Sequence, residues 1–439
     1  MYEAAGRPVR TAQRNSTIWS RVSEDEFRRN LVALEERTNA VPSGVLVFPL
    51  QEETTDTLRL PLKVEQHVAD DLAFLAAVQE GAQSVAAVCL EQHLRPKAVL
   101  RIRIAAADFK DESLRAAMTH ICDILRSVSR GGSYDVNPAD ELLDQIVKRH
   151  QYKILGRLRS RKWEKPQYLA ASHKKPLWKD FENVIHRVQH VYPTKKEKAQ
   201  KKNVEGLLKA LAECYSRFED CERDELILQL RALVKSTYEF CTCREIGQFA
   251  ARLAGLRPTT QIAAAVKCLH QLEKIGAYER VSIDLVGSAL QYPSVFGDVE
   301  LEYLSPYASV PTSLAYEPWA KTCHVHAEIQ LVIDSDLPKV AAGNDDCEMF
   351  MPRVVGTSKY LCYLCYLFIK YHGRFIAPNT HGRLYDQWTV PDLAEYHDKT
   401  REHYAKVLAE INEVVLRQIA EGTCWRAEPM TSRQNLLLQ

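Results

Sequence analysis

The chain has 439 residues, a length that predicts two or three domains. Apolar residues make up 46% of the chain and charged residues 26%, so it can bury a core of ordinary size. The formal net charge of +1 gives the whole molecule no field that selects a class of partner.

Membrane and secreted proteins are disfavoured by the same first reading. The sequence has no run of 18 apolar residues, so we expect no membrane span. The first 20 residues lack the apolar centre of a signal peptide. Twelve cysteines in such a chain predict reduced thiols rather than a disulfide framework. We therefore expect a cytoplasmic or nuclear protein.

The chain begins with polar residues over 1–20, which predict a disordered tail. Ser23 is followed three residues later by Glu26, a capping-box pattern that predicts a helix to about residue 36. From there helical patterns dominate, and we expect residues 21–257 to form a mainly α-helical N-terminal region.

Strand signals in this region are few. Residues 62–94 carry helical periodicity over most of their length. Alternating or continuous apolar runs predict short strands over 45–50 and 98–104. Amphipathic patterns predict further helices over 111–129, 138–156 and 178–192.

Residues 148–202 are strongly basic, with seventeen Lys and Arg against four Asp and Glu. Aromatic residues are interleaved with the charges, a pattern that favours single-stranded nucleic acid through phosphate attraction and base stacking. A solvated helical face, a linker or a nuclear import signal would show the same charge. The predicted contact residues are Arg157, Arg159, Arg161, Lys162 and Trp163.

The C-terminal part, 258–425, predicts alternating helices and strands, followed by a tail over 426–439. A helix is expected over 258–276, with strands over 281–285 and 299–304. Residues 391–420 predict a long, charged amphipathic helix that packs on the sheet or binds a protein partner.

Two short motifs carry the chemistry. His326-Ala327-Glu328 is an H-x-E motif, and Cys362 and Cys365 form a C-x-x-C motif. Residues three apart on a helix share a face, so both thiols can reach one ion from the start of a helix that Gly373 would end. One imidazole and two thiolates on zinc, with a carboxylate kept off the metal, are the inventory of a zinc deaminase.

The motifs and their flanking residues resemble one superfamily. An H-A-E helix, a strand and a C-x-x-C helix are similar to the cytidine deaminase-like superfamily. Gly356-Thr357-Ser358-Lys359 before the cysteines, and Thr380-His381-Gly382-Arg383-Leu384-Tyr385 after them, resemble its OTT-like branch of nucleic acid and nucleotide deaminases, of fungal type. The resemblance covers residues 280–400. Leu361 stands where most members have Pro, so base specificity does not carry over.

The resemblance implies a fold and an activity. The fold would be α/β, a three-layer α/β/α domain with a mixed sheet. His326, Cys362 and Cys365 would hold Zn²⁺, and Glu328 would move protons during removal of an exocyclic amine from a nucleobase. The backbone around Ala327 and Ser358 lies where relatives hold the base, and we predict that His381 also contacts the substrate.

Three alternatives stay open at this point. The zinc site could be structural, with a fourth protein ligand from Cys323, His324 or Cys347. The protein could be a free nucleoside or nucleotide deaminase, or a catalytically silent zinc scaffold that binds other proteins through its helical N-terminal region. These residues do not distinguish cytosine from adenine as the target base, or DNA from RNA as the nucleic acid.

Overall fold

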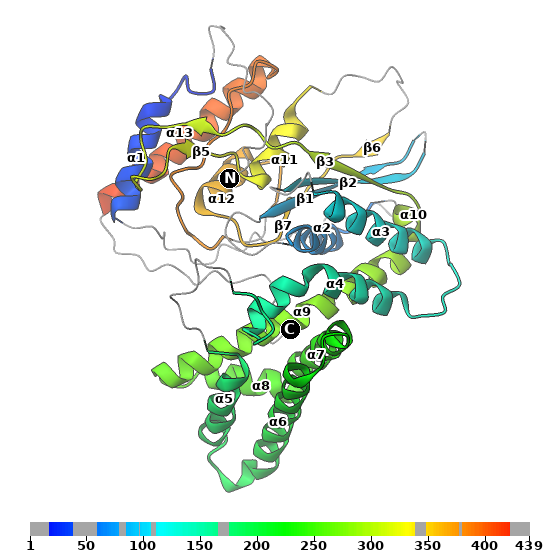
Figure 1. The fold of residues 1–439 in the computed structure, drawn as a ribbon. Coiled ribbons are helices and arrows are strands. Elements are labelled where there is room, and N and C mark those ends of the chain that lie inside the picture. The colour runs from blue at the N-terminus through cyan, green and yellow to red at the C-terminus, as the bar shows by residue number, and fades with distance from the viewer. Residues whose placement is uncertain are drawn as a thin grey trace. The chain divides into compact units, whose positions relative to one another are not determined.

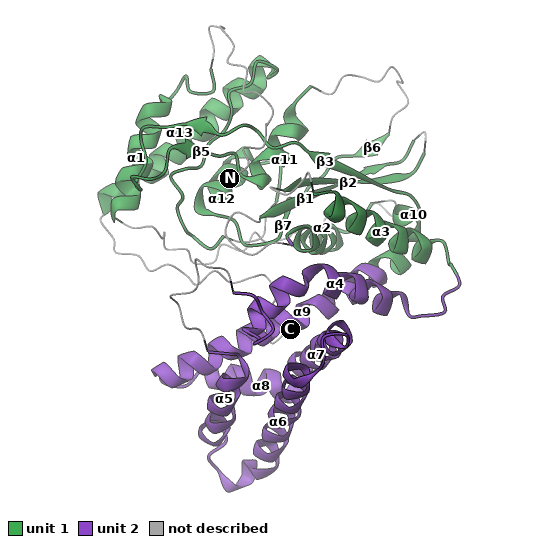
Figure 2. Ribbon diagram, in the orientation of Figure 1, with its two compact units in different colours: residues 1–77, 81–132, 288–433 green, residues 78–80, 133–287, 434–439 purple. Residues whose placement is uncertain are grey.

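The computed structural model describes residues 17–37, 59–78, 85–95, 97–106, 111–165, 175–338, 348–376 and 380–421. The chain forms two compact units (Figure 1). The described residues of unit 1 fall in 1–77, 81–132 and 288–433, and nearly all those of unit 2 fall in 133–287 (Figure 2). Unit 1 therefore combines sequence from both sides of residue 257, where the sequence suggested a domain boundary.

A mixed sheet lies at the centre of unit 1. β1 (Ala86–His93) and β2 (Val99–Ala106) pair antiparallel along their whole lengths, and β3 (Val299–Leu304) pairs parallel with β2. Two short strands, β6 (Met349–Phe350) and β7 (Gly356–Thr357), pair antiparallel with the free edge of β1. The predicted α/β class with a mixed sheet is confirmed.

Helices cover both faces of this sheet. α2 (Leu62–Ala76) and α3 (Glu112–Ser129) lie on one face, and α11 (Ala327–Asp336) lies on the other, next to α12 (Tyr363–His372) (Figure 1). Because neighbouring strand residues point to opposite faces, β1 and β2 are buried over most of their lengths. The remaining elements of unit 1 are α1 (Glu24–Arg37), α10 (Pro293–Phe296), β4 (Val310–Pro311), β5 (Thr322–Cys323) and α13 (Asp398–Glu421).

The glycine of the Gly-Thr-Ser-Lys motif is required by packing. A Cβ atom on Gly356 would lie 2.3 Å from the backbone carbon of Ala69 in α2. Real Cβ contacts do not come so close, so any larger residue would push α2 away from the sheet. The motif therefore has glycine at this position because a helix lies against the strand that precedes the cysteines.

Unit 2 is helical throughout its described residues. α5 shows the common pattern, since its buried residues Phe181, Val184, Val188 and Val191 recur every three or four positions. The helices are α4 (Pro138–Leu158), α5 (Trp178–Val191), α6 (Lys198–Asp220), α7 (Leu226–Thr242), α8 (Arg244–Ala254) and α9 (Thr260–Gln291), with a short 3₁₀ helix at Lys195–Glu197. The predicted helices over 138–156 and 178–192 are confirmed.

Other predicted elements differ from the structure. The helical pattern over 62–94 ends at Ala76, and residues 86–93 form β1, because a short apolar run suits a buried strand as well as a helix. The strand expected over 281–285 is part of α9, where Tyr278, Ser282, Leu285 and Ala289 continue a helical burial pattern.

The chain ends also differ. Ile18 is fully buried, so the structured part of unit 1 begins inside the predicted tail 1–20. The last long helix starts at Asp398 rather than near 391, and it packs on α1 and α12. The strand expected over 45–50 lies outside the described residues. Within the described ranges, no helix has the length and apolar character that a membrane crossing requires.

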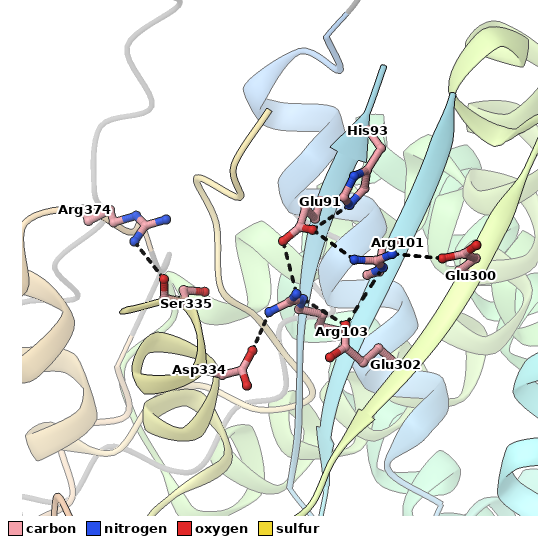
Figure 3. Close-up of polar contacts among 9 residues, drawn as sticks. All are labelled: Glu91, His93, Arg101, Arg103, Glu300, Glu302, Asp334, Ser335 and Arg374. Carbon is pink, nitrogen blue, oxygen red and sulfur yellow. Dashed lines mark hydrogen bonds and ion pairs between the residues drawn. The ribbon is translucent and has the colours of Figure 1, made fainter. Parts of the chain in front are cut away.

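A network of ion pairs connects α11 to the sheet (Figure 3). Arg103 of β2 is buried and forms an ion pair with Asp334 of α11. The same guanidinium lies 3.5 Å from Glu91 of β1 and 3.2 Å from Glu302 of β3. Glu91 is itself buried, so Arg103 neutralises charge where water cannot reach.

Replacing Arg103 tests how much these ion pairs stabilise the fold. Arg103→Met should lower the free energy of unfolding by about 3–5 kcal/mol, because it leaves Glu91 and Asp334 without a major partner in a buried setting. Arg101→Met is the matched control, since Arg101 contacts Glu91 and Glu300 but keeps a third of its side chain exposed. We expect the control substitution to lower the free energy of unfolding, measured by urea titration, by less than about 1 kcal/mol. Equal costs for the two variants would contradict this account.

Candidate metal centre

His326 lies immediately before α11, in the conformation that the motif requires. Its backbone is extended (φ −69°, ψ 154°), and the helix begins at Ala327. The junction is held in place because Gln330 donates from its amide side chain to the carbonyl of Val325 at 3.0 Å. The imidazole therefore leaves the chain outside the helix, while Glu328 projects from its first turn.

Cys362 begins α12 in the same way. It is the N-cap residue, and its Sγ accepts a hydrogen bond from the backbone N–H of Cys365 at 3.3 Å. The helix that follows is apolar on nearly every side, and it ends at Gly373, whose φ of 76° suits glycine. The predicted helix and its end are both confirmed.

The two helix starts bring three donor atoms together. His326 Nδ1 lies 3.5 Å from Cys362 Sγ and 3.4 Å from Cys365 Sγ. These donor atoms all lie within 4.8 Å of one another. In a tetrahedral zinc site, ligand bonds of 2.0–2.1 Å to nitrogen and 2.3 Å to sulfur imply an N–S distance of about 3.6 Å. The observed spacing and the donor set therefore fit zinc.

The electrostatics of the cluster favour a thiolate. Burial alone would raise the pKa of the Cys362 thiol, but hydrogen bonding with Cys365 and the imidazole of His326 hold that pKa well below its ordinary value. Burial lowers the pKa of His326, but Cys362 more than offsets this and the pKa is raised. A metal cation would stabilise the same thiolate.

Glu328 is adjacent to the cluster and does not belong to it. Its carboxylate is buried, with Oε2 3.7 Å from Cys365 Sγ. Burial raises its pKa, and the charge of His326 opposes that rise. A carboxyl group whose pKa is raised by burial can hold and transfer a proton at a pH closer to neutral.

The loop after residue 380 runs along the start of α12. Both the Thr380 hydroxyl (2.9 Å) and the His381 N–H (3.0 Å) donate to the carbonyl of Leu361. His381 is buried, and burial lowers its pKa. The rings of His381 and His326 lie 6.0 and 6.3 Å from that of Tyr385, so the loop borders the cluster. Contact between His381 and a substrate stays a prediction.

The two other predicted substrate contacts have different surroundings. Ala327 is the first residue of α11 and is buried beside His326. Ser358 exchanges two hydrogen bonds with Ala86, because its N–H donates to the Ala86 carbonyl and its hydroxyl accepts from the Ala86 N–H. The Ser358 side chain is thus part of the sheet edge, and its role toward a base stays a prediction.

The alternative fourth ligands lie outside the cluster. Cys323 is buried against the guanidinium of Arg28, with Sγ and Nη1 2.6 Å apart. His324 is exposed, and its Nε2 lies 3.2 Å from the hydroxyl of Thr322. Cys347 falls outside the described residues. In the part of the chain that is described, the candidate metal-binding group therefore offers three protein ligands, and a tetrahedral metal held by them would have one position left for water or substrate.

The five predicted nucleic-acid contacts are in unit 2, and most are engaged within it. Arg157 donates to the carbonyl of Lys274, Arg159 pairs with Asp180, and Arg161 lies 3.6 Å from Glu219. Trp163 packs against Tyr152, with ring centroids 6.1 Å apart, and Lys162 donates to the carbonyl of Cys221.

One feature near the cluster had no signal in the sequence. Glu35 of α1 accepts a hydrogen bond from the N–H of Asp386 at 3.1 Å, and the carboxylate of Asp386 accepts one from the N–H of Tyr316 at 2.6 Å. Burial, followed by the charge of Asp386, raises the pKa of Glu35 to about 7. More than 350 residues separate the partners, so no local pattern could reveal them.

Residues 325–392 match a protein-family model described as "OTT_1508_deam:-like deaminase". The matched segment contains His326, Glu328, Cys362 and Cys365. The match supports a deaminase-family domain in unit 1, with hydrolytic deamination as the general class of reaction. The search of the curated proteins found no match, and neither did the search of the solved structures.

Metal content is the direct test of the centre. The purified protein should carry about one zinc per chain by elemental analysis, and the double variant Cys362→Ala, Cys365→Ala should lose it. The control is Cys214→Ala, Cys221→Ala, which removes two partly exposed thiols from unit 2. Full zinc retention in the first pair would rule out this assignment.

The Glu35–Asp386 contact predicts a pH-dependent stability. The pKa of Glu35 is about 7 in the folded chain, against an ordinary value of 4.5, so the folded state binds this proton more tightly. That contribution is fully present below pH 4.5 and is lost as the pH rises through 7.

Glu35→Gln keeps an acceptor for the Asp386 N–H and cannot ionise. Its melting temperature should match the wild type at acidic pH and exceed it at pH 8. Glu36→Gln, on the exposed neighbouring residue, should follow the wild type at both values. A Glu35→Gln variant with the wild-type pH profile would show that this carboxyl group does not titrate as described.

Proposed function

We propose that unit 1 is a zinc-dependent hydrolytic deaminase that acts on a nucleobase. The observation that carries the proposal is the convergence of His326, Cys362 and Cys365, with Glu328 beside them and outside the donor set. A structural zinc would need a fourth protein ligand, and none of the described residues supplies it. The family match over 325–392 supports the same class of reaction.

When bound, zinc would supply Lewis-acid activation of a water molecule. Glu328 would accept one proton of that water and deliver it to the ring nitrogen. It would then pass the proton of the hydroxyl group formed on the base to the departing amine, which leaves as ammonia. Its position supports this role, because the carboxylate is close to Cys365 but makes no contribution to the three-donor set. The burial that raises its pKa also fits a group that both accepts and donates protons.

The chain around the site would hold the base. Ala327 and Ser358 would present backbone groups, and His381 would contact the base or a phosphate. His381 already has its Nδ1 engaged by the N–H of Arg383 at 3.1 Å, so Nε2 is the nitrogen it would offer to a substrate. The fixed ring orientation supports a defined contact rather than a mobile one.

We further propose that the base is part of a single-stranded nucleic acid, in the cytoplasm or the nucleus. The charge segregation over 148–202 supports this choice, although Arg159 and Arg161 are paired with acids in unit 2. Protein partners would bind through the helical N-terminal region or the exposed side of α13, where Leu416 is 43% exposed.

Glu328→Gln separates catalysis from metal binding. The variant should keep its zinc and its melting temperature, while deamination falls by at least about 100-fold because the proton carrier is lost. The assay measures ammonia release, and the mass of the base, with single strands and free nucleosides that contain cytosine or adenine. Glu413→Gln, an exposed carboxylate on α13, should retain full activity.

The same panel distinguishes the alternatives. Wild-type activity on free nucleosides alone would favour a nucleoside deaminase over a nucleic-acid deaminase. A zinc-loaded wild type that is inactive on every substrate would favour a silent scaffold. Unchanged activity of Glu328→Gln on an established substrate would refute the proposed mechanism.

A further inference from the structure

A cavity of about 690 Å³ lies entirely within unit 2, between the end of α4, the turn that follows it and the start of α7. Its volume falls within the range of about 300–1,000 Å³ that is typical of small-molecule sites. None of the zinc-centre residues lines it, but Lys162 does, and Lys162 belongs to the basic segment that supports the proposed binding of single strands.

The charge of the lining is predominantly positive. Four cationic side chains, from Lys148, Arg149, Lys162 and Arg223, face two carboxylates, from Glu164 and Glu222. Both carboxylates are exposed, whereas Arg149 and Lys162 are partly buried. Lys148 and Arg223 are exposed as well. With four cationic side chains against two carboxylates, the lining carries net positive charge, which favours an anion in the cavity.

Three of these cations have no acidic partner among the described residues. Lys162 donates its Nζ to the main-chain carbonyl of Cys221 at 2.7 Å, a contact that orients the ammonium group and leaves its charge uncompensated. Lys148 and Arg223 also form no ion pair with a described carboxylate. Arg159 and Arg161 differ, because each has an acidic partner. Three cations that form no ion pair with a described carboxylate thus meet at the cavity.

An aromatic ring completes the lining. Tyr152 is 44% exposed, and its hydroxyl donates to the carbonyl of Glu164 at 2.9 Å. Its ring lies 6.1 Å from the ring of Trp163, so two contacts fix its orientation. An exposed ring held in place beside cations can stack on a flat heterocycle whose phosphates reach the ammonium groups.

We propose that this cavity binds a nucleotide, either free or as one unit of a single strand. Lys148, Lys162 and Arg223 contact its phosphates, and Tyr152 stacks on its base. The site is separate from the zinc centre, and a ligand bound there does not have to be the substrate of deamination.

The test measures binding to the full-length protein and uses no activity, so its failure is distinguishable from failure of the proposed deaminase. The probes are a nucleoside triphosphate, inorganic triphosphate, the unphosphorylated nucleoside and a single-stranded 20-mer, each titrated by calorimetry. We expect the nucleoside triphosphate to bind and inorganic triphosphate to compete with it. The nucleoside alone should bind at least ten-fold more weakly.

Lys162→Ala, Arg223→Ala should weaken nucleoside triphosphate binding by at least ten-fold. The control Lys195→Ala, Lys196→Ala removes the same charge from exposed residues of the same basic segment and should change binding by less than two-fold. Tyr152→Leu should weaken binding of the nucleoside triphosphate by roughly ten-fold and leave binding of inorganic triphosphate unchanged, because only the base stacks on the tyrosine ring. Circular dichroism and melting temperature verify that each variant is folded.

Competition identifies the source of the nucleotide. A 20-mer that displaces the nucleoside triphosphate, and that loses affinity in the Lys162→Ala, Arg223→Ala variant, assigns the site to a strand. Triphosphate binding that the 20-mer does not displace assigns it to a free nucleotide. Absence of binding by all four probes, or equal losses in the cavity and control variants, overturns the proposal.

Discussion

The centre of unit 1 depends on the packing of two helix starts. His326 and Cys362 are both N-cap residues with extended backbones, so each side chain leaves the chain just before a helix begins. The donors converge only because α11 and α12 pack side by side in the core. Fully buried residues such as Ile329, Leu364 and Phe368 each contribute about 1.5–3 kcal/mol to that packing.

The far ends of the two helices are also held together. Asp336, the last residue of α11, accepts hydrogen bonds from His372 at the end of α12 and from the Tyr404 hydroxyl of α13, each at 2.8 Å. His372 and Arg374 hold the pKa of Asp336 low despite its burial. With both ends fixed, neither helix can rotate and carry its donor atom out of the cluster.

Polar contacts connect this pair of helices to distant parts of the chain. Arg103 joins α11 to the central strands, and Arg28 of α1 contacts both Cys323 and Thr389. Glu35 holds Asp386 in the loop beside the cluster. Segments from the first 40 residues and the last 120 thus build one site, which explains why unit 1 is discontinuous in sequence.

The sequence by itself determined the local parts of the site. The spacing within each motif was sufficient to predict an H-x-E helix start, a C-x-x-C helix and its end at Gly373, because these features depend on residues within one or two turns. It also predicted β2, β3 and several amphipathic helices, such as α5, whose buried positions recur every three or four residues.

Tertiary structure determined the features that depend on contacts between residues far apart in the sequence. Residues 86–93 became a strand because β2 and the two short strands pair with them, although their apolar run also suited a helix. Acidic residues on α5 and α6 decided which of the predicted nucleic-acid contacts are paired, since Arg159 and Arg161 meet Asp180 and Glu219. Such contacts join residues that no local pattern relates, so they exist only once the chain has folded.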